Sequence, residues 1–135
     1  MTPTMSATTM IQRNPSEVSA ARRFIGGRLT AWGLGHLVPD AGLMASETVT
    51  NAIEYGGEPI DLTVMCSEST MRVSVSDGSH EVPTSAGLPA DDAPFGRGIE
   101  IVRMLARDFG VDLVEGDGKT VWFELATDAR QVALR

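Results

Sequence analysis

Glu47 and Asn51 lie four residues apart in a segment, residues 45–53, whose composition predicts a helix. Side chains four positions apart share one face of a helix. We expect the same face to carry Met44, Thr48 and Leu43 toward the core. A carboxylate and a carboxamide that point inward are costly to bury without partners. The pair therefore predicts a ligand, a metal ion or a polar network at this face.

The chemistry that this pair could support is phosphoryl transfer. Asn51 offers an amide oxygen, which Mg²⁺ can bind together with phosphate oxygens and water. Glu47, one turn earlier, could accept a proton from a hydroxyl group or a water that attacks the γ-phosphate of a nucleotide. The alternative interpretation is structural, with Glu47 as a residue near a helix N-terminus and Asn51 as a surface residue.

Two further short motifs follow along the chain. Asp77 and Gly78 stand at the end of a predicted strand, where a carboxylate could accept a hydrogen bond from an exocyclic amine and a glycine leaves room for a flat base. Gly96, Arg97 and Gly98 precede a predicted helix, whose free N–H groups and the Arg97 guanidinium could bind phosphate. The alternatives are an ordinary Asp-Gly turn and a flexible hinge.

The elements that must position these residues follow from hydrophobic periodicity. We expect a flexible N-terminal tail over residues 1–13, with a short strand at residues 8–13, and a C-terminal tail over residues 127–135. The domain between them spans residues 14–126, and Asn14 is expected to cap its first helix. Helices are predicted at residues 14–32, 39–55 and 98–109, and strands at residues 60–67, 71–76, 111–115 and 120–126.

This order of elements is helix, helix, hairpin, loop, helix, hairpin. It predicts an α+β fold, a two-layer sandwich in which helices cover one face of a mixed, mainly antiparallel sheet. The length of 135 residues fits one domain. The single cysteine, Cys66, cannot form an internal disulfide and is expected to be a small core or edge residue.

Charge and hydropathy exclude several classes of function. The net charge of −7 and the pI of about 4.7 argue against direct binding of nucleic acid. Apolar runs stay short of the roughly 18 residues that a membrane span needs. The first 14 residues lack the pattern of a signal peptide, so we expect a cytoplasmic protein without membrane contact.

Taken together and in this order, the motifs resemble those of the GHKL ATPase superfamily, which has the Bergerat nucleotide-binding fold. The resemblance covers residues 14–126 and rests on four segments: residues 47–52 (N box), 77–78 (first glycine box), 96–99 (second glycine box) and 118–125 (closing strand). Residues 21–24 and 31–34 resemble one branch, the small single-domain anti-sigma-factor-like serine/threonine kinases that are abundant in actinomycete bacteria.

The resemblance implies ATP and Mg²⁺ as cofactors. It assigns Glu47 as the general base and Asn51 as the Mg²⁺ ligand; contact with adenine falls to Asp77, Gly78 and Thr120, and contact with phosphate to Gly96, Arg97 and Gly98. Three features depart from the family pattern. Tyr55 stands where many relatives carry histidine. The segment after Asp77 and Gly78 has no further close glycine, and the segment before Gly96 contains prolines and only one Gly-x-Gly.

The function implied is an ATP-dependent protein serine/threonine kinase. Its substrate would be an anti-anti-sigma-type protein, it could also bind a sigma factor, and it would regulate transcription by partner switching. Relatives commonly dimerise, so a homodimer is expected. One alternative is a non-catalytic module that senses nucleotide or binds a partner protein. Another is a histidine-kinase catalytic domain, which would need a separate protein to carry the phospho-acceptor histidine.

Overall fold

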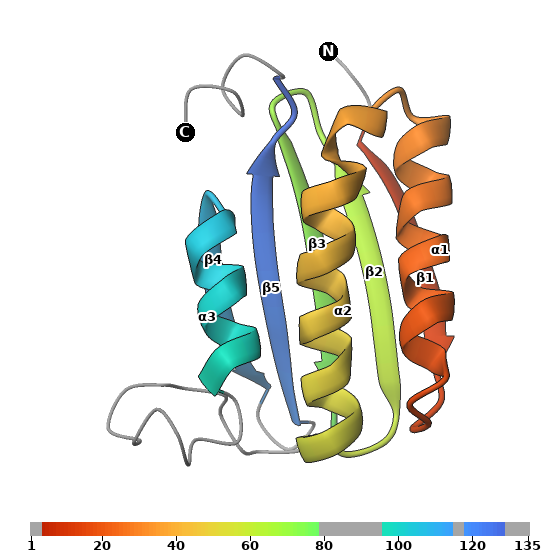
Figure 1. Cartoon of the computed structure of the whole chain (residues 1–135), viewed down its shortest axis with the longest axis vertical. Coiled ribbons are helices and arrows are strands. Elements are labelled where there is room, and N and C mark those ends of the chain that lie inside the picture. Colours follow the sequence, from red (N-terminus) through yellow and green to blue (C-terminus); the bar gives the residue numbers. More distant parts are fainter. Residues whose placement is uncertain (1–3, 79–95, 115–117, 129–135) are drawn as a thin grey trace.

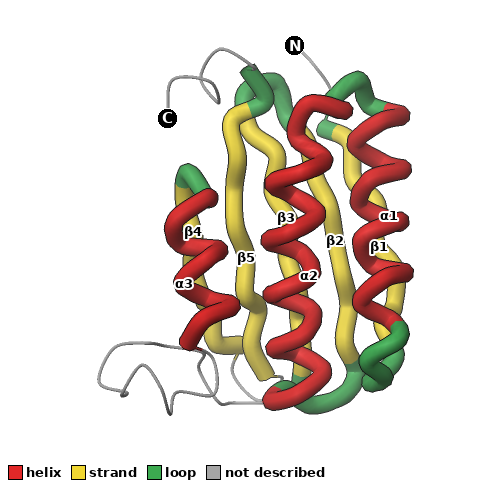
Figure 2. The backbone as a smooth tube through the Cα atoms, viewed as in Figure 1, coloured by secondary structure: helices red, strands yellow, loops and turns green. Residues whose placement is uncertain are grey.

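A sheet with helices on one side organises the chain (Figure 1). The computed structural model describes residues 4–78, 96–114 and 118–128. The elements in chain order are β1 (Met5–Ile11), α1 (Glu17–Ala31), a short 3₁₀ helix η1 (Gly35–Leu37), α2 (Val38–Tyr55), β2 (Ile60–Cys66), β3 (Thr70–Asp77), α3 (Gly96–Leu105), β4 (Asp108–Val114) and β5 (Gly118–Ala126). Figure 2 shows α1, α2 and α3 side by side over the same face of the sheet. The predicted two-layer α+β fold is confirmed.

The sheet has the strand order β1-β2-β3-β5-β4. Each neighbouring pair in the described residues is antiparallel, so the expectation of a mixed sheet was wrong. The reason lies in the connection through α3. It carries the chain from β3 to the far edge at β4, and β5 then returns beside β3 in the opposite direction. As a result the end of β3 and the start of β5 are neighbours.

Alternating burial along the strands defines the two faces of the sheet. In β2 and β3 every second residue is buried, as expected for a sheet with one covered face. Both layers contribute large buried side chains to one core, including Ile25, Leu29, Met44, Val49, Leu62, Val64, Val73 and Phe123. Each such side chain contributes roughly 1.5–3 kcal/mol by leaving water. The core thus holds the ends of β3, β5 and α2 in fixed positions.

The N-terminal part of the domain differs from the prediction. Strand β1 begins at Met5, and its residues 5–11 pair with the whole of β2, so this segment belongs to the sheet and not to a loose tail. Helix α1 begins at Glu17, and Asn14 does not cap it. Instead the Asn14 Oδ1 atom accepts hydrogen bonds from the backbone N–H and the hydroxyl of Ser16, both at 3.0 Å. Asn14 therefore closes a local turn before the helix.

The third helix is shorter than predicted. It ends at Leu105, and Asp108–Val114 form strand β4 instead of the last turn of a helix. Gly110, which directly follows the predicted helix end at residue 109, lies opposite Trp122 in the β4–β5 pair. A Cβ atom on Gly110 would collide with the Trp122 indole ring. The glycine is therefore required for packing within the sheet. None of the helices in the described ranges is long and apolar enough to cross a membrane.

Cys66 lies at the end of β2 and is buried, as predicted for a small core or edge residue. Burial raises the pKa of the Cys66 thiol. Because the thiolate is the reactive form, alkylation by iodoacetamide at pH 8 is expected to be at least about tenfold slower in the folded protein than in denaturant. Mass spectrometry of a labelling time course measures this ratio. Equal rates in buffer and in denaturant would contradict the buried placement.

Candidate functional site

The elements that carry the predicted site residues meet at one end of the molecule. The C-terminal ends of α2 and β3 and the N-terminal ends of α3 and β5 lie together, at the lower end of Figure 1. Asp77 is the last residue of β3, and Gly96 is the first residue of α3. Asn51 lies one turn before the end of α2. The antiparallel hairpins and the crossover through α3 thus gather residues that are far apart in the sequence.

Asp77 is buried, with 4% of its surface exposed, on the helix-facing side of the sheet. Lys119 lies directly opposite on β5 and is 3% exposed. Its Nζ atom is 3.0 Å from Asp77 Oδ1 and 2.9 Å from Oδ2. The backbone N–H of Gly57 also donates to Oδ1, at 3.4 Å. A buried ion pair, bonded through both carboxylate oxygens, therefore stands where the adenine-binding carboxylate was predicted.

Glycines surround this ion pair and allow the backbone to pack closely against it. A Cβ atom on Gly56 would lie 2.7 Å from Asp77 Cγ, and one on Gly78 would lie 2.5 Å from the carbonyl oxygen of Glu58. Gly118 has φ +100° and directly abuts the Asp77 carbonyl oxygen, a conformation and a contact that L side chains do not tolerate. The predicted place for a flat base beside Gly78 is thus a region where three backbone segments converge.

Lys119 is the residue that the sequence-based interpretation missed. Thr120 was assigned to adenine, but its hydroxyl lies 2.8 Å from the Ser76 hydroxyl, on the sheet face that the helices do not cover. The structure therefore does not bring Thr120 to Asp77. A signal for Lys119 was present, because it alternates in phase with Val121 and with two later apolar residues of β5 that point into the core.

Glu47 and Asn51 are both half-buried on α2. Met44 and Thr48 lie in the core as expected, but Leu43 is 43% exposed, so its inward orientation was wrongly predicted. The Asn51 Nδ2 atom is buried, and it has no hydrogen-bond partner within the parts of the chain that the structure describes. Buried amides are almost always paired. An unpaired amide on this helix is therefore a feature that a ligand can satisfy.

The orientation of α2 decides which neighbour Glu47 and Asn51 face. Val38 Cγ1 would lie 3.7 Å from a Cβ on Gly26, so the Val38 side of α2 packs against α1. Helical periodicity places Glu47 and Asn51 on the roughly opposite side. Because α2 lies between α1 and α3 (Figure 2), the pair faces toward α3. The N-terminus of α3 is where Gly96, Arg97 and Gly98 were predicted to bind phosphate.

Part of the predicted site lies outside the described residues. The backbone of α3 is described from Gly96, but the side chains of residues 96–99 are not, so the orientation of Arg97 is not part of the described structure. The proline-bearing segment before the helix also lies outside, within residues 79–95. The structure shows that α3 begins at Gly96. The backbone N–H groups that have no partner within a helix lie at its start.

Tyr55 is the last residue of α2. Desolvation raises the pKa of its phenol, and the adjacent Glu54 carboxylate raises it further through its charge and a hydrogen bond. The phenol therefore stays protonated at neutral pH. It can donate a hydrogen bond there, but it does not exchange a proton near pH 7 as an imidazole does.

The donors available for a cation are few. Within the described ranges, no cluster of three or more His, Cys, Asp or Glu side chains could hold a metal ion. Mg²⁺ at nucleotide sites is usually held by one or two protein oxygens, phosphate oxygens and water. The position of Asn51 Nδ2, which has no partner within the described part of the chain, fits such a site, because rotation of the amide exchanges its oxygen and nitrogen positions. The residues present therefore fit a metal that arrives with a nucleotide.

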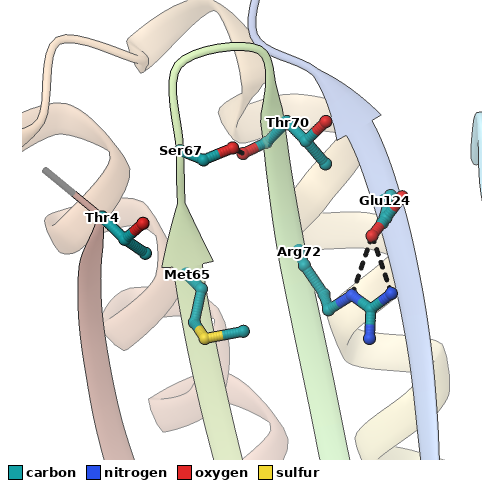
Figure 3. A pocket seen from close by; sticks show the side chains of 6 residues that line it. All are labelled: Thr4, Met65, Ser67, Thr70, Arg72 and Glu124. Atoms are coloured by element: carbon teal, nitrogen blue, oxygen red, sulfur yellow. Dashed lines mark hydrogen bonds and ion pairs between the residues drawn. The ribbon is translucent and has the colours of Figure 1, made fainter. Parts of the chain in front are cut away.

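A hollow lies on the uncovered face of the sheet (Figure 3). It has a volume of about 200 Å³ and is lined by Thr4, Met65, Ser67, Thr70, Arg72 and Glu124. Arg72 donates from Nε to Glu124 Oε2 at 2.8 Å, and its guanidinium carbon lies 4.0 Å from the centre of the Trp122 ring. Because Arg72 is already paired and stacked, this hollow offers no preformed phosphate site.

The comparison with known families agrees with this arrangement. The family model for the histidine kinase-like ATPase domain matches residues 11–125, from the end of β1 to β5. The match contains Glu47, Asn51 and Asp77 together with the ion-pair partner Lys119. No curated protein matches the chain.

Proposed function

Because the chain belongs to the histidine kinase-like ATPase family, whose domains bind ATP, we propose that it is a protein serine/threonine kinase. Its proposed phospho-acceptor is an anti-anti-sigma-type protein, and it uses ATP with Mg²⁺. The observation that carries the proposal is the buried Asn51 Nδ2 atom, which has no hydrogen-bond partner among the described residues, on the side of α2 that faces α3. It lies one turn from the helix end that packs against Asp77.

The proposed reaction is a direct phosphoryl transfer. The hydroxyl oxygen of the acceptor attacks the γ-phosphorus, the bond from that phosphorus to the β,γ-bridging oxygen breaks, and ADP leaves. Glu47 takes the proton of the attacking hydroxyl. Asn51 would hold Mg²⁺, which would neutralise charge on the phosphate oxygens. The N–H groups at the start of α3 would bind the phosphates.

The proposed biological role is control of transcription by partner switching in the cytoplasm. The kinase would bind a sigma factor when its acceptor protein is phosphorylated, and release it when the acceptor is not. The net charge of −7 supports protein partners over direct contact with nucleic acid. We also propose a homodimer as the working assembly.

A non-catalytic nucleotide sensor is a second candidate. The observation that favours it is the Lys119 ammonium, which already contacts both oxygens of the Asp77 carboxylate. A nucleotide must bind beside this ion pair or displace it. Transfer from γ-labelled ATP to an anti-anti-sigma-type protein discriminates between the two, because a sensor would bind ATP and leave that protein unlabelled.

Calorimetry with the Asn51→Leu variant tests nucleotide binding. We expect the wild type to bind ATP in a Mg²⁺-dependent manner and the variant to bind it at least about tenfold more weakly. Its stability should be unchanged or higher by about 1 kcal/mol, because an unsatisfied buried amide is removed. Ser46→Ala, on the opposite side of α2, is the matched control and should bind like the wild type. Absence of ATP binding by the wild type at millimolar concentration would refute the proposal.

A further inference from the structure

Helix α2 ends without the features that usually close a helix. Its last turn contains no basic residue, and Glu54 places a negative charge there. Cations, not anions, stabilise a helix C-terminus, because the helix dipole leaves a partial negative charge at that end. Gly56, which follows the helix, has φ −93° and ψ −178°, so it is extended and does not form the left-handed glycine cap. The last carbonyl groups of α2 therefore need a donor from another segment.

Arg13 supplies that donor. It lies in the link between β1 and α1, 40 positions before Ile53 in the sequence, and this link is at the same lower end of Figure 1 as the end of α2. The Arg13 Nε atom donates to the Ile53 carbonyl oxygen at 2.8 Å, and its Nη2 atom reaches the Glu54 carbonyl oxygen at 3.5 Å. One guanidinium thus caps the helix and places positive charge at its negative end.

The turn that Arg13 caps adjoins the candidate site. Asn51 lies one turn before the end of α2, and in an α-helix its carbonyl accepts from the N–H of the residue four positions later, Tyr55. Just beyond the helix, the Gly57 carbonyl accepts from the Gly78 N–H at 2.7 Å, which ties this end of α2 to the end of β3. Opening of the last turn would free the Asn51 backbone and shift its side chain.

We propose that Arg13 is a positioning residue for the metal ion of the site. By holding the last turn of α2, its guanidinium fixes the Asn51 amide where that amide binds Mg²⁺. Asp77 keeps its contact with Lys119 when Arg13 is replaced, so Arg13 acts on the metal-dependent part of ATP binding alone. The inference rests on the proposed function, since it requires that the chain binds ATP with Mg²⁺.

Arg13→Met removes the guanidinium and keeps an unbranched side chain. We expect calorimetry on the full chain to show ATP with Mg²⁺ bound at least about threefold more weakly than by the wild type, because the competent turn is less populated. ATP without Mg²⁺ should bind within about 1.5-fold of the wild type. Arg13→Lys keeps the charge and a donor at the helix end, and should bind ATP with Mg²⁺ within about 1.5-fold of the wild type.

A double variant tests whether Arg13 acts through Asn51. In the Asn51→Leu background, Arg13→Met should change the affinity for ATP with Mg²⁺ by less than about 1.5-fold, because the group that it positions is already gone. Arg23→Met is the matched control. Its guanidinium donates to the Ser19 hydroxyl at 2.8 Å within α1, so the substitution removes the same charge from a helix without site residues. It should bind ATP like the wild type.

Hydrogen exchange without nucleotide gives a second readout. In Arg13→Met the backbone N–H groups of Tyr55 and Gly56 are expected to exchange at least about threefold faster than in the wild type, since the last turn opens more often. Arg23→Met should leave both rates within about 1.5-fold of the wild type. Unchanged exchange in Arg13→Met would show that the guanidinium does not hold the turn, and would overturn the inference.

The outcomes separate this inference from the proposed function. Equal affinity of the wild type and Arg13→Met for ATP with Mg²⁺ would overturn the positioning role and leave the proposed function standing. An equal loss with and without Mg²⁺, or a full further loss in the Asn51→Leu background, would also overturn it, because either would indicate a general structural role. If the wild type bound no nucleotide, both the proposed function and this inference would be refuted.

Discussion

Replacing Lys119 with methionine is expected to lower the free energy of unfolding by about 3–5 kcal/mol, because it leaves the Asp77 carboxylate buried without its counter-ion. The side chain of Asp77 is 1% exposed, so water cannot replace the lost contacts. The contact from the Gly57 N–H to Asp77 Oδ1, at 3.4 Å, is long for a hydrogen bond. Urea denaturation followed by circular dichroism measures the change.

A double variant separates the ion pair from simple loss of packing. Asp77→Leu combined with Lys119→Met replaces both charges with apolar side chains, and replacements of this kind are often neutral or stabilising. We expect the free energy of unfolding of the double variant to lie within about 1–2 kcal/mol of the wild-type value, although Lys119→Met alone is much less stable. If the double variant were as unstable as Lys119→Met, the loss would come from packing around the lysine stem and not from an unpaired charge.

Elements with a local sequence pattern are the parts of the fold that could be predicted from the sequence. Helix α2 ends at Tyr55, as its apolar spacing and the following Gly56 predicted. The alternation that predicted β2 and β3 is also found in their burial. These features depend on residues within one element, where local periodicity is sufficient. The spacing of Glu47 and Asn51 on one helix face is of the same kind.

The wrong predictions depend on contacts between distant segments. Gly110 reads locally as the end of a helix, but its place in β4 is decided by the Trp122 ring across the sheet. Lys119 alternates along β5 in phase with the core residues, but lysine is a residue type that usually lies on the surface. Only Asp77, 42 positions away on the neighbouring strand, makes its burial tolerable. Because the register of β3 on β5 cannot be read from either strand alone, Lys119 was missed, and Thr120 was assigned to adenine on the family resemblance.

Glu47→Gln is expected to slow phosphoryl transfer to the acceptor protein about 10²–10⁴-fold, the usual contribution of a general base. The amide keeps the size of the side chain but cannot take the hydroxyl proton. ATP affinity should stay within about threefold of the wild type, because Asn51 and Asp77 are unchanged. Single-turnover transfer from γ-labelled ATP and calorimetry measure the two quantities separately.

The matched control for this substitution is Glu54→Gln, which makes the same change at an exposed position of the same helix. It should leave both transfer and ATP affinity within about twofold of the wild type, since exposed substitutions rarely change a site that they do not contact. If Glu47→Gln lost transfer and ATP binding together, Glu47 would act in holding the nucleotide or its metal. The base would then have to be sought on the acceptor protein, because Tyr55, with its raised pKa, keeps its proton at neutral pH.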